Sequence, residues 1–505
     1  MNAPDPSPAV PETAPLSTGE IRNRAVRGVA STVTSQVAAQ AIRLILGVYL
    51  ARKLTPDDVG LVAIVAAVTA TGDLLRDQGM TYALIQSKDL DDRHLNSAFR
   101  YMSILTVIEI LLLAGLAPAA AWFYGRPELT AITLGLCFAS AAGGFAALPL
   151  ALLKRRMQFD RLAAIQIASL ALAVPVVAAG AALGWGYYAL MLYMVLPAVL
   201  TLAGAWLACD WRPGLSAAPG GWRPVAAAGR RFLGVDLLTQ WLQMADALIL
   251  GRLLAVSQLG LYQRAHNVRM LATALVDSTL VPVSLSGLSR LQDRPEAFWK
   301  AYRTSVYAMS VLLAPPALLL AVAPAECLGY VFGRQWIPAA PALRLNALLL
   351  LLFPLIRATH AGLSALGRTD LLVRWLLAAM ILLVLGLFAG RPWGLPGVTA
   401  GMVLSQLLAL PLGLAAFAAQ GGSTVRELLR TSLPFLAAAA VLGLAAWPLA
   451  RLAGPETAAA WPRLAVGAAA AGLMTLFMAW HAFHSETGRL VLAMLRPLIP
   501  LPRRP

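Results

Sequence analysis

The chain has 505 residues, of which 59% are hydrophobic and 13% are charged, and its formal net charge is +16. These values exclude a soluble globular protein, because too few polar residues are left to cover a surface in water. The composition predicts an all-α integral membrane protein, since the alternating ten-residue strands of a membrane barrel are not visible.

Taken in chain order, residues 1–20 are polar and Pro-rich and predict a disordered cytoplasmic tail. About fourteen apolar stretches near the 20-residue length that spans a bilayer follow. The predicted transmembrane helices cover residues 29–52, 57–79, 97–121, 129–153, 161–183, 187–208, 231–254, 258–283, 302–325, 340–365, 371–389, 394–418, 432–451 and 462–482.

One short pattern occurs twice. Five residues of LARKLTPDDVGL at 50–61 return 200 positions later in LGRLLAVSQLGL at 250–261; they are Leu50, Arg52, Leu54, Gly60 and Leu61, answered by Leu250, Arg252, Leu254, Gly260 and Leu261. Each copy lies between two apolar runs and predicts a tight turn between two helices. The chain is therefore expected to be a duplication of a unit of roughly 200 residues.

The duplication defines the predicted domains. Six helices are an even number, so both units start on the same side of the membrane and form parallel repeats. The predicted parts are an N-terminal six-helix bundle at 21–208, a cytoplasmic linker at 209–230, a C-terminal six-helix bundle at 231–420, two additional transmembrane helices at 421–484 and a cytoplasmic tail at 485–505.

The basic residues predict the orientation. They do not form one patch suited to nucleic acid but alternate between loops, with clusters at 22–27, 154–156, 223–231 and 489–504 on one side. By the positive-inside rule, both termini lie in the cytoplasm.

Two charged amphipathic segments follow the second and the eighth predicted helix, KDLDDRHLNSAFR at 88–100 and LQDRPEAFWKAYR at 291–303. We expect them to form helices along the inner membrane interface. A plain solvated loop is the alternative interpretation.

The sequence carries no motif for covalent chemistry. It has no Gly-Lys dipeptide of a phosphate loop, no His followed by Glu and no Gly-x-Ser-x-Gly elbow. We therefore expect no enzyme, no catalytic residue, no metal site and no cofactor. A coupling ion, H⁺ or Na⁺, is left open.

Polar side chains inside the first helix are candidate substrate-binding residues. Gln36, Gln40 and Arg43 recur every three or four residues and form one stripe. Arg43 lies about ten residues from the outer turn and therefore near mid-bilayer. Inserting an arginine side chain at that depth costs a free energy on the order of 3 kcal/mol. Two interpretations are open: Arg43 binds an anionic ligand, or it pairs with Asp73 or Asp77 of the second helix.

Three further helices supply candidates for the same cavity. They are Asp73, Arg76 and Asp77 in the second helix, Asp236, Gln240 and Gln243 in the seventh, and Arg264, Asn267 and Asp277 in the eighth. An intrahelical ion pair is the alternative for the first set, and extension of the side chain to the outer interface is the alternative for Arg264. Asp246 is expected to be structural, either capping the outer corner or pairing with Arg252.

Several of these segments together resemble a known family. LARKLTPDDVGLVAIV, WFYGRPEL, LLKRRMQFDRLA and ADALILGRLLAVSQLGLYQRAHNV look like the polysaccharide transporter, or oligosaccharide flippase, family of the multidrug/oligosaccharidyl-lipid/polysaccharide exporter superfamily. The resemblance covers about residues 25–420. It implies two six-helix bundles around a central cavity, two extra C-terminal helices and alternating access.

The same resemblance implies the cargo, a polyprenyl-diphosphate-linked glycan moved across the bacterial inner membrane for lipopolysaccharide, O-antigen or exopolysaccharide synthesis. Membrane lipid, a glycan polymerase and export machinery are the further partners it implies, and nucleic acid is not among them. A drug or cation exporter of the same superfamily and a membrane glycan polymerase are the alternatives. Arg43 is answered by Gln243 in the second unit, so the cationic site is expected to be asymmetric.

Overall fold

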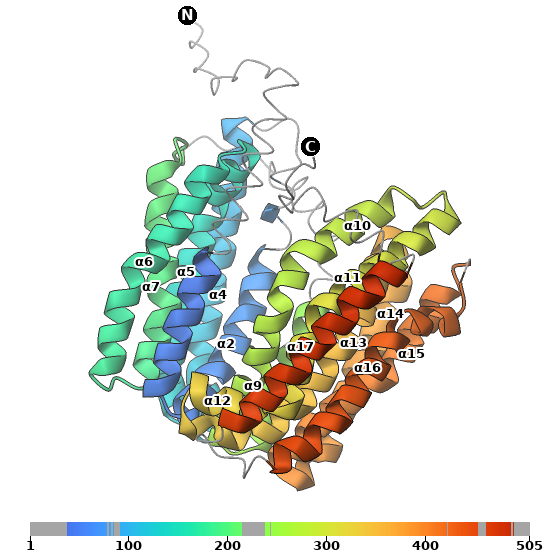
Figure 1. The fold of residues 1–505 in the computed structure, drawn as a ribbon. Helices are drawn as coiled ribbons and strands as arrows, with labels where there is room; N and C mark the ends of the chain where they lie inside the picture. The colour runs from blue at the N-terminus through green and yellow to red at the C-terminus, as the bar shows by residue number, and fades with distance from the viewer. Residues whose placement is uncertain are drawn as a thin grey trace, which may run out of the picture. The chain divides into compact units, whose positions relative to one another are not determined.

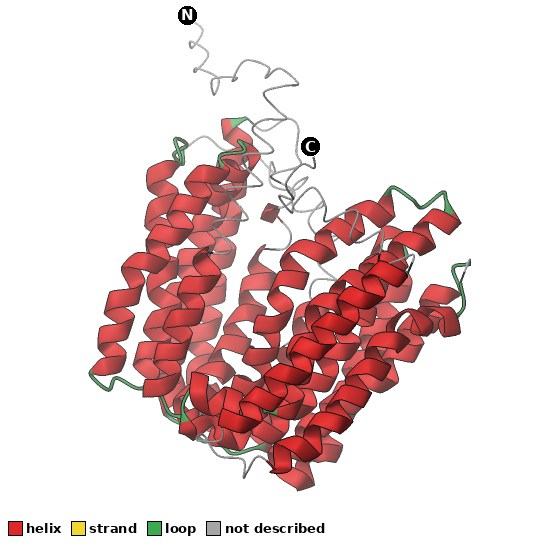
Figure 2. Cartoon of the chain, in the orientation of Figure 1, coloured by secondary structure: helices red, strands yellow, loops and turns green. Residues whose placement is uncertain are grey.

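The computed structural model describes residues 38–77, 80, 81, 84, 91–214, 238–242, 244–421, 423–452, 461–485 and 488, and it describes only the backbone of Leu74, Leu75 and Asp77. All regular structure in these ranges is helical (Figure 2), which confirms the prediction of an all-α protein. The chain divides into two compact units, Met1–Trp241 and Leu242–Pro505, each of which is described by itself (Figure 1). The predicted tail at 1–20 and most of the linker and of the C-terminal tail lie outside the described residues.

Unit 1 is a helical bundle built around α5. A helix over 38–53 is followed by α2 (Pro56–Asp77), α4 (Asp92–Tyr124), α5 (Glu128–Arg155), α6 (Phe159–Ala182) and α7 (Tyr187–Ala208). α5 packs against α2, α4, α6 and α7. Its most apolar part is 61% buried against 6% for α7, so α5 forms the centre of the unit and α7 faces outward.

Unit 2 repeats this plan with α13 at its centre. After a helix over 244–253 come α9 (Val256–Leu275), the π-helix η1 (Val276–Leu280), α10 (Val281–Ser289), α11 (Pro295–Val322), α12 (Pro324–Val331), the 3₁₀-helix η2 (Arg334–Ala339), α13 (Ala340–Ala365), α14 (Thr369–Gly390), η3 (Arg391–Trp393), α15 (Gly394–Ala418), α16 (Val425–Leu452) and α17 (Trp461–His484). α13 packs against α9, α10, α11 and α15. The two C-terminal helices α16 and α17 pack against each other and against α11.

The duplicated turn has the same form in both units, as predicted. The backbone N–H of Leu54 donates to the carbonyl of Leu50 at 2.9 Å, and that of Leu254 donates to Leu250 at 2.9 Å. In both copies a helix ends three residues after the leading Leu and a new helix begins two residues after the bend. The repeat in the sequence is therefore a repeat in structure.

The two amphipathic segments are not separate interfacial helices, and that prediction is wrong. Residues 92–100 are the first turns of α4, and residues 295–303 are the first turns of α11. Asp91 begins α4 because its carboxylate accepts the His94 backbone N–H at 2.8 Å, and this hydrogen bond lowers the pKa of Asp91. No helix-breaking residue follows either charged segment before the apolar run, so the helix continues without interruption.

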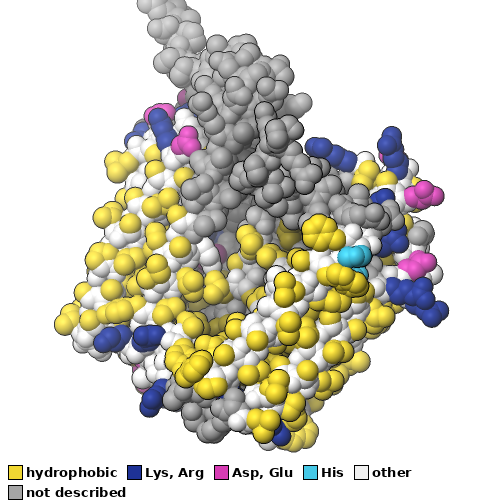
Figure 3. Space-filling view, in the orientation of Figure 1, with side chains coloured by type: hydrophobic (Ala, Val, Ile, Leu, Met, Phe, Trp, Pro, Cys, Tyr) yellow, Lys and Arg dark blue, Asp and Glu magenta, His cyan; other side chains and the backbone are white. Residues whose placement is uncertain are grey.

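The apolar surface of the helices fits a membrane environment. Among the described residues, ten helical stretches are long and apolar enough to cross a bilayer, and one of them joins α14 and α15 as Thr369–Ala418. Leu111, Leu172, Leu385 and Leu444 are each at least 60% exposed. Figure 3 shows hydrophobic side chains over the middle of the helices and charged side chains toward their ends. A polytopic membrane protein is therefore confirmed, while the count of fourteen helices stays a prediction.

A buried ion pair ties α17 to the rest of unit 2. Nε of Arg463 lies 3.3 Å from Oε1 of Glu326 on α12, and the two side chains are 4% and 0% exposed. Removing either partner alone leaves a charge in an apolar interior, which is strongly destabilising.

Four glycines let α14 and α15 cross at backbone contact. A Cβ at Gly401 would lie 2.0 Å from the carbonyl oxygen of Gly386, and a Cβ at Gly397 would lie 2.2 Å from that of Gly390. Both helices thus present a Gly-x-x-x-Gly face, the spacing that allows close helix approach in membranes.

We expect Gly401→Ala to lower the free energy of unfolding by about 1–3 kcal/mol, because its methyl group overlaps backbone that cannot rotate away. Gly472→Ala in α17 is the matched control, since no atom lies within 4 Å of its Cβ position. Thermal unfolding of the purified variants in detergent measures the difference. Equal melting temperatures for the two variants contradict the close crossing.

Candidate functional site

Unit 1 contains a cluster of ionisable side chains between α2 and α4. Nη1 of Arg76 lies 2.8 Å from Oδ1 of Asp73 and 2.9 Å from Oε2 of Glu109. The same nitrogen donates to the backbone carbonyl of Ser140 on α5 at 2.8 Å. Three helices of unit 1 therefore meet at one guanidinium. The predicted intrahelical pair of Asp73 and Arg76 is present, and Glu109 is an additional partner.

Arg43 forms no ion pair with the described side chains of that cluster. Its side chain is half-buried, as is that of Gln40 three residues earlier, so the two share one face of their helix. Asp73 pairs with Arg76, and the side chain of Asp77 lies outside the described residues. The guanidinium acts electrostatically on the Tyr193 hydroxyl of α7. Asp73 is therefore paired with Arg76, while the alternative that Arg43 pairs with Asp77 stays a prediction.

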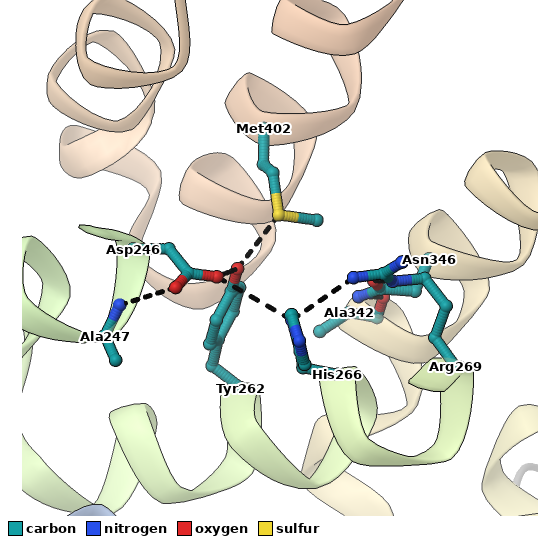
Figure 4. A network of polar contacts seen from close by, with 8 residues as sticks. All are labelled: Asp246, Ala247, Tyr262, His266, Arg269, Ala342, Asn346 and Met402. Carbon is teal, nitrogen blue, oxygen red and sulfur yellow. Dashed lines mark hydrogen bonds and ion pairs between the residues drawn. The ribbon is translucent and has the colours of Figure 1, made fainter. Parts of the chain in front are cut away.

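Unit 2 contains a different polar network, drawn in Figure 4. Asp246 accepts the Tyr262 hydroxyl at 2.5 Å and the Ala247 backbone N–H at 2.7 Å. The Tyr262 oxygen also lies 2.9 Å from Sδ of Met402 on α15. The expected role of Asp246 as a structural residue agrees with these contacts, but its partner is Tyr262 and not Arg252.

The network continues along α9 to α13. Nδ1 of His266 lies 3.7 Å from Oδ2 of Asp246 and 3.4 Å from Nη2 of Arg269. Nε of Arg269 donates to Oδ1 of Asn346 at 3.0 Å. Nδ1 can accept from Arg269 or donate to Asp246, but not both with one tautomer. The tautomer of this ring therefore decides which of the two neighbours Nδ1 can serve.

A second ion pair lies farther along the same face of α9. Oδ1 of Asp277 is 2.8 Å from Nε of Arg357 on α13. Asp277 belongs to the π-helix η1, an element that is common at functional sites. Tyr262, His266, Arg269 and Asp277 thus lie on one polar stripe of α9 and its extension.

The remaining predicted site residues are dispersed. The Arg264 guanidinium lies 4.3 Å from the centre of the Trp336 ring and 5.0 Å from that of Phe332, so it is buried in a cation–π contact inside unit 2. Asn267 is exposed, and Gln240 is half-buried. Gln36, Asp236, Gln243 and the side chain of Asp77 lie outside the described residues.

Sequence reasoning missed Glu109 and the Tyr262–His266–Arg269 face. A lone glutamate in an apolar run of more than 20 residues is itself a signal, because such carboxylates are rare in membrane helices. The spacing of 262, 266, 269 and 277 is helical and indicates one face, whereas Arg264 and Asn267 lie on another. The pairing of Glu109 with Arg76, and of Arg269 with Asn346, carries no signal in the sequence because it joins different helices.

The described residues hold polar groups for binding and for proton exchange but no group of three or more His, Cys, Asp and Glu that could hold a metal ion. Arg43 offers five N–H donors in a planar fork that matches phosphate oxygens. Gln40 offers donors and an acceptor to hydroxyl groups. The chemistry of this face suits a ligand with both an anionic group and sugar hydroxyls.

Residues 49–341 match a family model described as polysaccharide biosynthesis protein. The lipopolysaccharide biosynthesis protein WzxC of Escherichia coli K12 is 23% identical over 400 residues, which are 77% of this chain and 80% of the relative. The succinoglycan biosynthesis transport protein ExoT of Rhizobium meliloti 1021 is 24% identical over 324 residues, which are 64% of this chain and 65% of the relative.

The fold is similar to that of a solved transporter. The inward closed conformation of the lipid II flippase MurJ superimposes with a TM-score of 0.69 at 13% identity, over 92% of this chain and 99% of that protein. Because the superposition covers nearly the whole of both chains, it includes the helical bundles of both units.

The hydrogen bond between Asp246 and Tyr262 gives a testable coupling. Asp246→Ala and Tyr262→Phe should each lower the free energy of unfolding by about 1–3 kcal/mol, because each leaves a buried polar partner unsatisfied. The double variant should lose less free energy of unfolding than the sum of the two single variants, since it contains neither the unpaired Tyr262 hydroxyl nor the unpaired Asp246 carboxylate. Thermal unfolding in detergent measures the cycle.

Ser310→Ala is the control, because the Ser310 hydroxyl donates only to a carbonyl of its own helix, that of Val306 at 2.8 Å. We expect it to change the melting temperature little. If the loss in free energy of unfolding of the double variant equals the sum of the losses of the two single variants, the hydrogen bond between Asp246 and Tyr262 is contradicted.

Proposed function

The chain belongs to the polysaccharide biosynthesis protein family, and we propose that it is a flippase for a polyprenyl-diphosphate-linked oligosaccharide. It carries this lipid-linked precursor across the bacterial inner membrane for synthesis of a surface polysaccharide such as lipopolysaccharide, O-antigen or exopolysaccharide. Translocation proceeds by alternating access, and the chain performs no covalent chemistry. A glycan polymerase and export machinery act on the product.

Family membership and a transporter fold support this function together. The family model covers 293 of the 505 residues (341 − 49 + 1 = 293), which is more than half of the chain. The similarity to MurJ extends over 92% of the chain. A polysaccharide biosynthesis protein with the fold of a lipid II flippase is best explained as a flippase for a lipid-linked glycan.

Arg43 is the single feature that carries the site proposal. An arginine near mid-bilayer costs on the order of 3 kcal/mol unless a counter-charge or water compensates it. Asp73 and Glu109 pair with Arg76, and among the described residues no ion pair compensates the Arg43 guanidinium, which supports an anionic ligand as its counter-charge. A lipid diphosphate supplies the compensating anion, and Gln40 on the same face meets sugar hydroxyls.

We expect Arg43→Ala to abolish glycan export while the protein stays in the membrane at normal amount, because the diphosphate loses its cationic contact. Arg43→Lys should restore part of the export, since lysine keeps the charge and loses the planar fork. The measurement is complementation of glycan export in a strain lacking the gene, with the amount of membrane protein determined in parallel.

Arg264→Ala is the matched control, because that arginine is buried against Trp336 and Phe332. It should lower the amount of folded protein, by loss of a desolvated cation–π contact of about 2 kcal/mol. Full export by Arg43→Ala at normal protein levels contradicts a ligand role for Arg43.

We further propose that both termini are cytoplasmic, on the basis of the basic residues that alternate between loops. Single cysteines at Ser216 and Pro127, in a chain that lacks Cys137, Cys209 and Cys327, should react with an impermeant thiol reagent from opposite sides. Pro127 is exposed at the start of α5, whereas Gly125 beside it has a φ of +67° that a cysteine would strain. Labelling of both positions from one side contradicts this orientation.

A further inference from the structure

We propose that Glu109, held by Arg76 beside Asp73, is a reversible proton-binding site that couples proton movement to transport. The inference rests on the proposed function and names the ion that drives it. The site lies wholly within unit 1. Glu109 is near the middle of the 33-residue helix α4, 15 residues and therefore about 22 Å from its outer end.

The charges of the cluster do not balance. Two carboxylates, Asp73 and Glu109, face one arginine, so the fully ionised cluster carries one excess negative charge. The Asp73 side chain is 43% exposed and can be solvated, whereas the Glu109 side chain is only 6% exposed. The free-energy cost of the excess negative charge is therefore greater on the buried Glu109, and binding of one proton to Glu109 removes this charge.

One oxygen of Glu109 is available for that proton. Oε2 accepts from Arg76 at 2.9 Å, but Oε1 is buried and has no hydrogen-bond partner among the described residues. Oε1 faces Gly72 of α2, where a methyl group would lie only 2.7 Å from it. The carboxylate thus has one oxygen committed to the cation and one oxygen with nothing to stabilise its negative charge.

The surrounding groups do not supply another charge. α2 contributes Asp73 and Arg76, and α5 contributes the Ser140 carbonyl and the thiol of Cys137, on which Glu109 acts electrostatically. The thiol is neutral in an apolar interior, and the carbonyl is already an acceptor for Arg76. Within the described elements packed against α4, Asp73 and Arg76 are therefore the charged groups that face Glu109.

A proton suits the site better than a metal ion. Hard cations take several oxygen ligands at once, whereas Oε1 is a single oxygen. The Arg76 guanidinium, bonded to the other oxygen of the same carboxylate, repels a second cation. A proton needs one lone pair and leaves a neutral acid that still accepts from Arg76 through Oε2.

Protonation changes how α2 is held. When Glu109 is ionised, Arg76 ties α2 to α4 by an ion pair, and when Glu109 is protonated this contact is weakened to a hydrogen bond from a cation to a neutral acid. α2 is joined by the turn at Leu54 to the helix that carries Gln40 and Arg43. The proton on Glu109 therefore acts on the hairpin that contacts the ligand in the proposed function.

Glu109→Gln is the main test variant, because the amide mimics the protonated acid and removes the excess charge. It should leave the amount of folded protein unchanged. Glu326→Gln is the matched control, since it removes a buried carboxylate that lies 3.3 Å from Arg463 and should lower the amount of folded protein. Equal losses for the two variants contradict the charge imbalance at Glu109.

Binding is tested on the purified full chain without substrate. Infrared difference spectra between acid and alkaline buffer should show the carbonyl band of a buried carboxylic acid, and the band should be absent in Glu109→Gln. A spectrum unchanged by Glu109→Gln overturns the site while leaving the flippase proposal intact.

Coupling is tested in proteoliposomes with a lipid-linked oligosaccharide. If one proton moves with each lipid-linked oligosaccharide, a gradient of one pH unit across the membrane should change the ratio of this lipid between the two leaflets by up to about tenfold in the wild type. In Glu109→Gln the distribution should stay near one to one although flipping continues. If the wild type flips the lipid to the same extent with and without the pH gradient, proton coupling is overturned. If the wild type does not flip the lipid at all, the proposed function itself is overturned.

Discussion

A charge inside an apolar helical bundle must find compensation within the bundle, and this constraint organises both units of the chain. Arg76 meets two carboxylates and a carbonyl, Arg463 meets Glu326, and Arg357 meets Asp277. Arg264 uses the rings of Trp336 and Phe332 instead. Apart from the pair of Arg76 with Asp73 inside α2, these contacts join different helices, so the charged residues contribute specific connections between otherwise apolar surfaces.

The departures from charge balance point to function. Glu109 adds a carboxylate to a pair that is already neutral, and Arg43 has no carboxylate among the described residues. An excess negative charge suits a proton, whereas an excess positive charge suits an anionic ligand. Both residues lie in unit 1. The helix of Arg43 is joined to α2 by the turn at Leu54, and α4, the helix of Glu109, packs against α2.

The duplication has preserved the framework and altered the polar chemistry. The two turns near Leu54 and Leu254 are alike, and α5 and α13 are each the central helix of their unit. Unit 1 places an ion cluster between α2 and α4, whereas unit 2 places the hydrogen-bonded chain from Asp246 to Asn346 along α9. The asymmetry that Arg43 and Gln243 suggest in sequence thus extends to the networks of the two units.

The sequence by itself determined the helical class, the membrane setting, the repeated turn and the approximate position of the helices, although α11 and α16 each begin seven residues before the predicted start. Apolar length and spacing are local properties, and the bilayer demands them of each helix separately. It also indicated the pair of Asp73 and Arg76, because that contact lies within one helical turn.

Only the tertiary structure decided which distant groups meet. Glu109 completes the cluster at Arg76, Tyr262 takes the place expected of Arg252 as the partner of Asp246, and the charged segments after the second and eighth helices continue into α4 and α11. Periodicity reports which face of a helix a residue occupies, but helix packing determines what that face contacts.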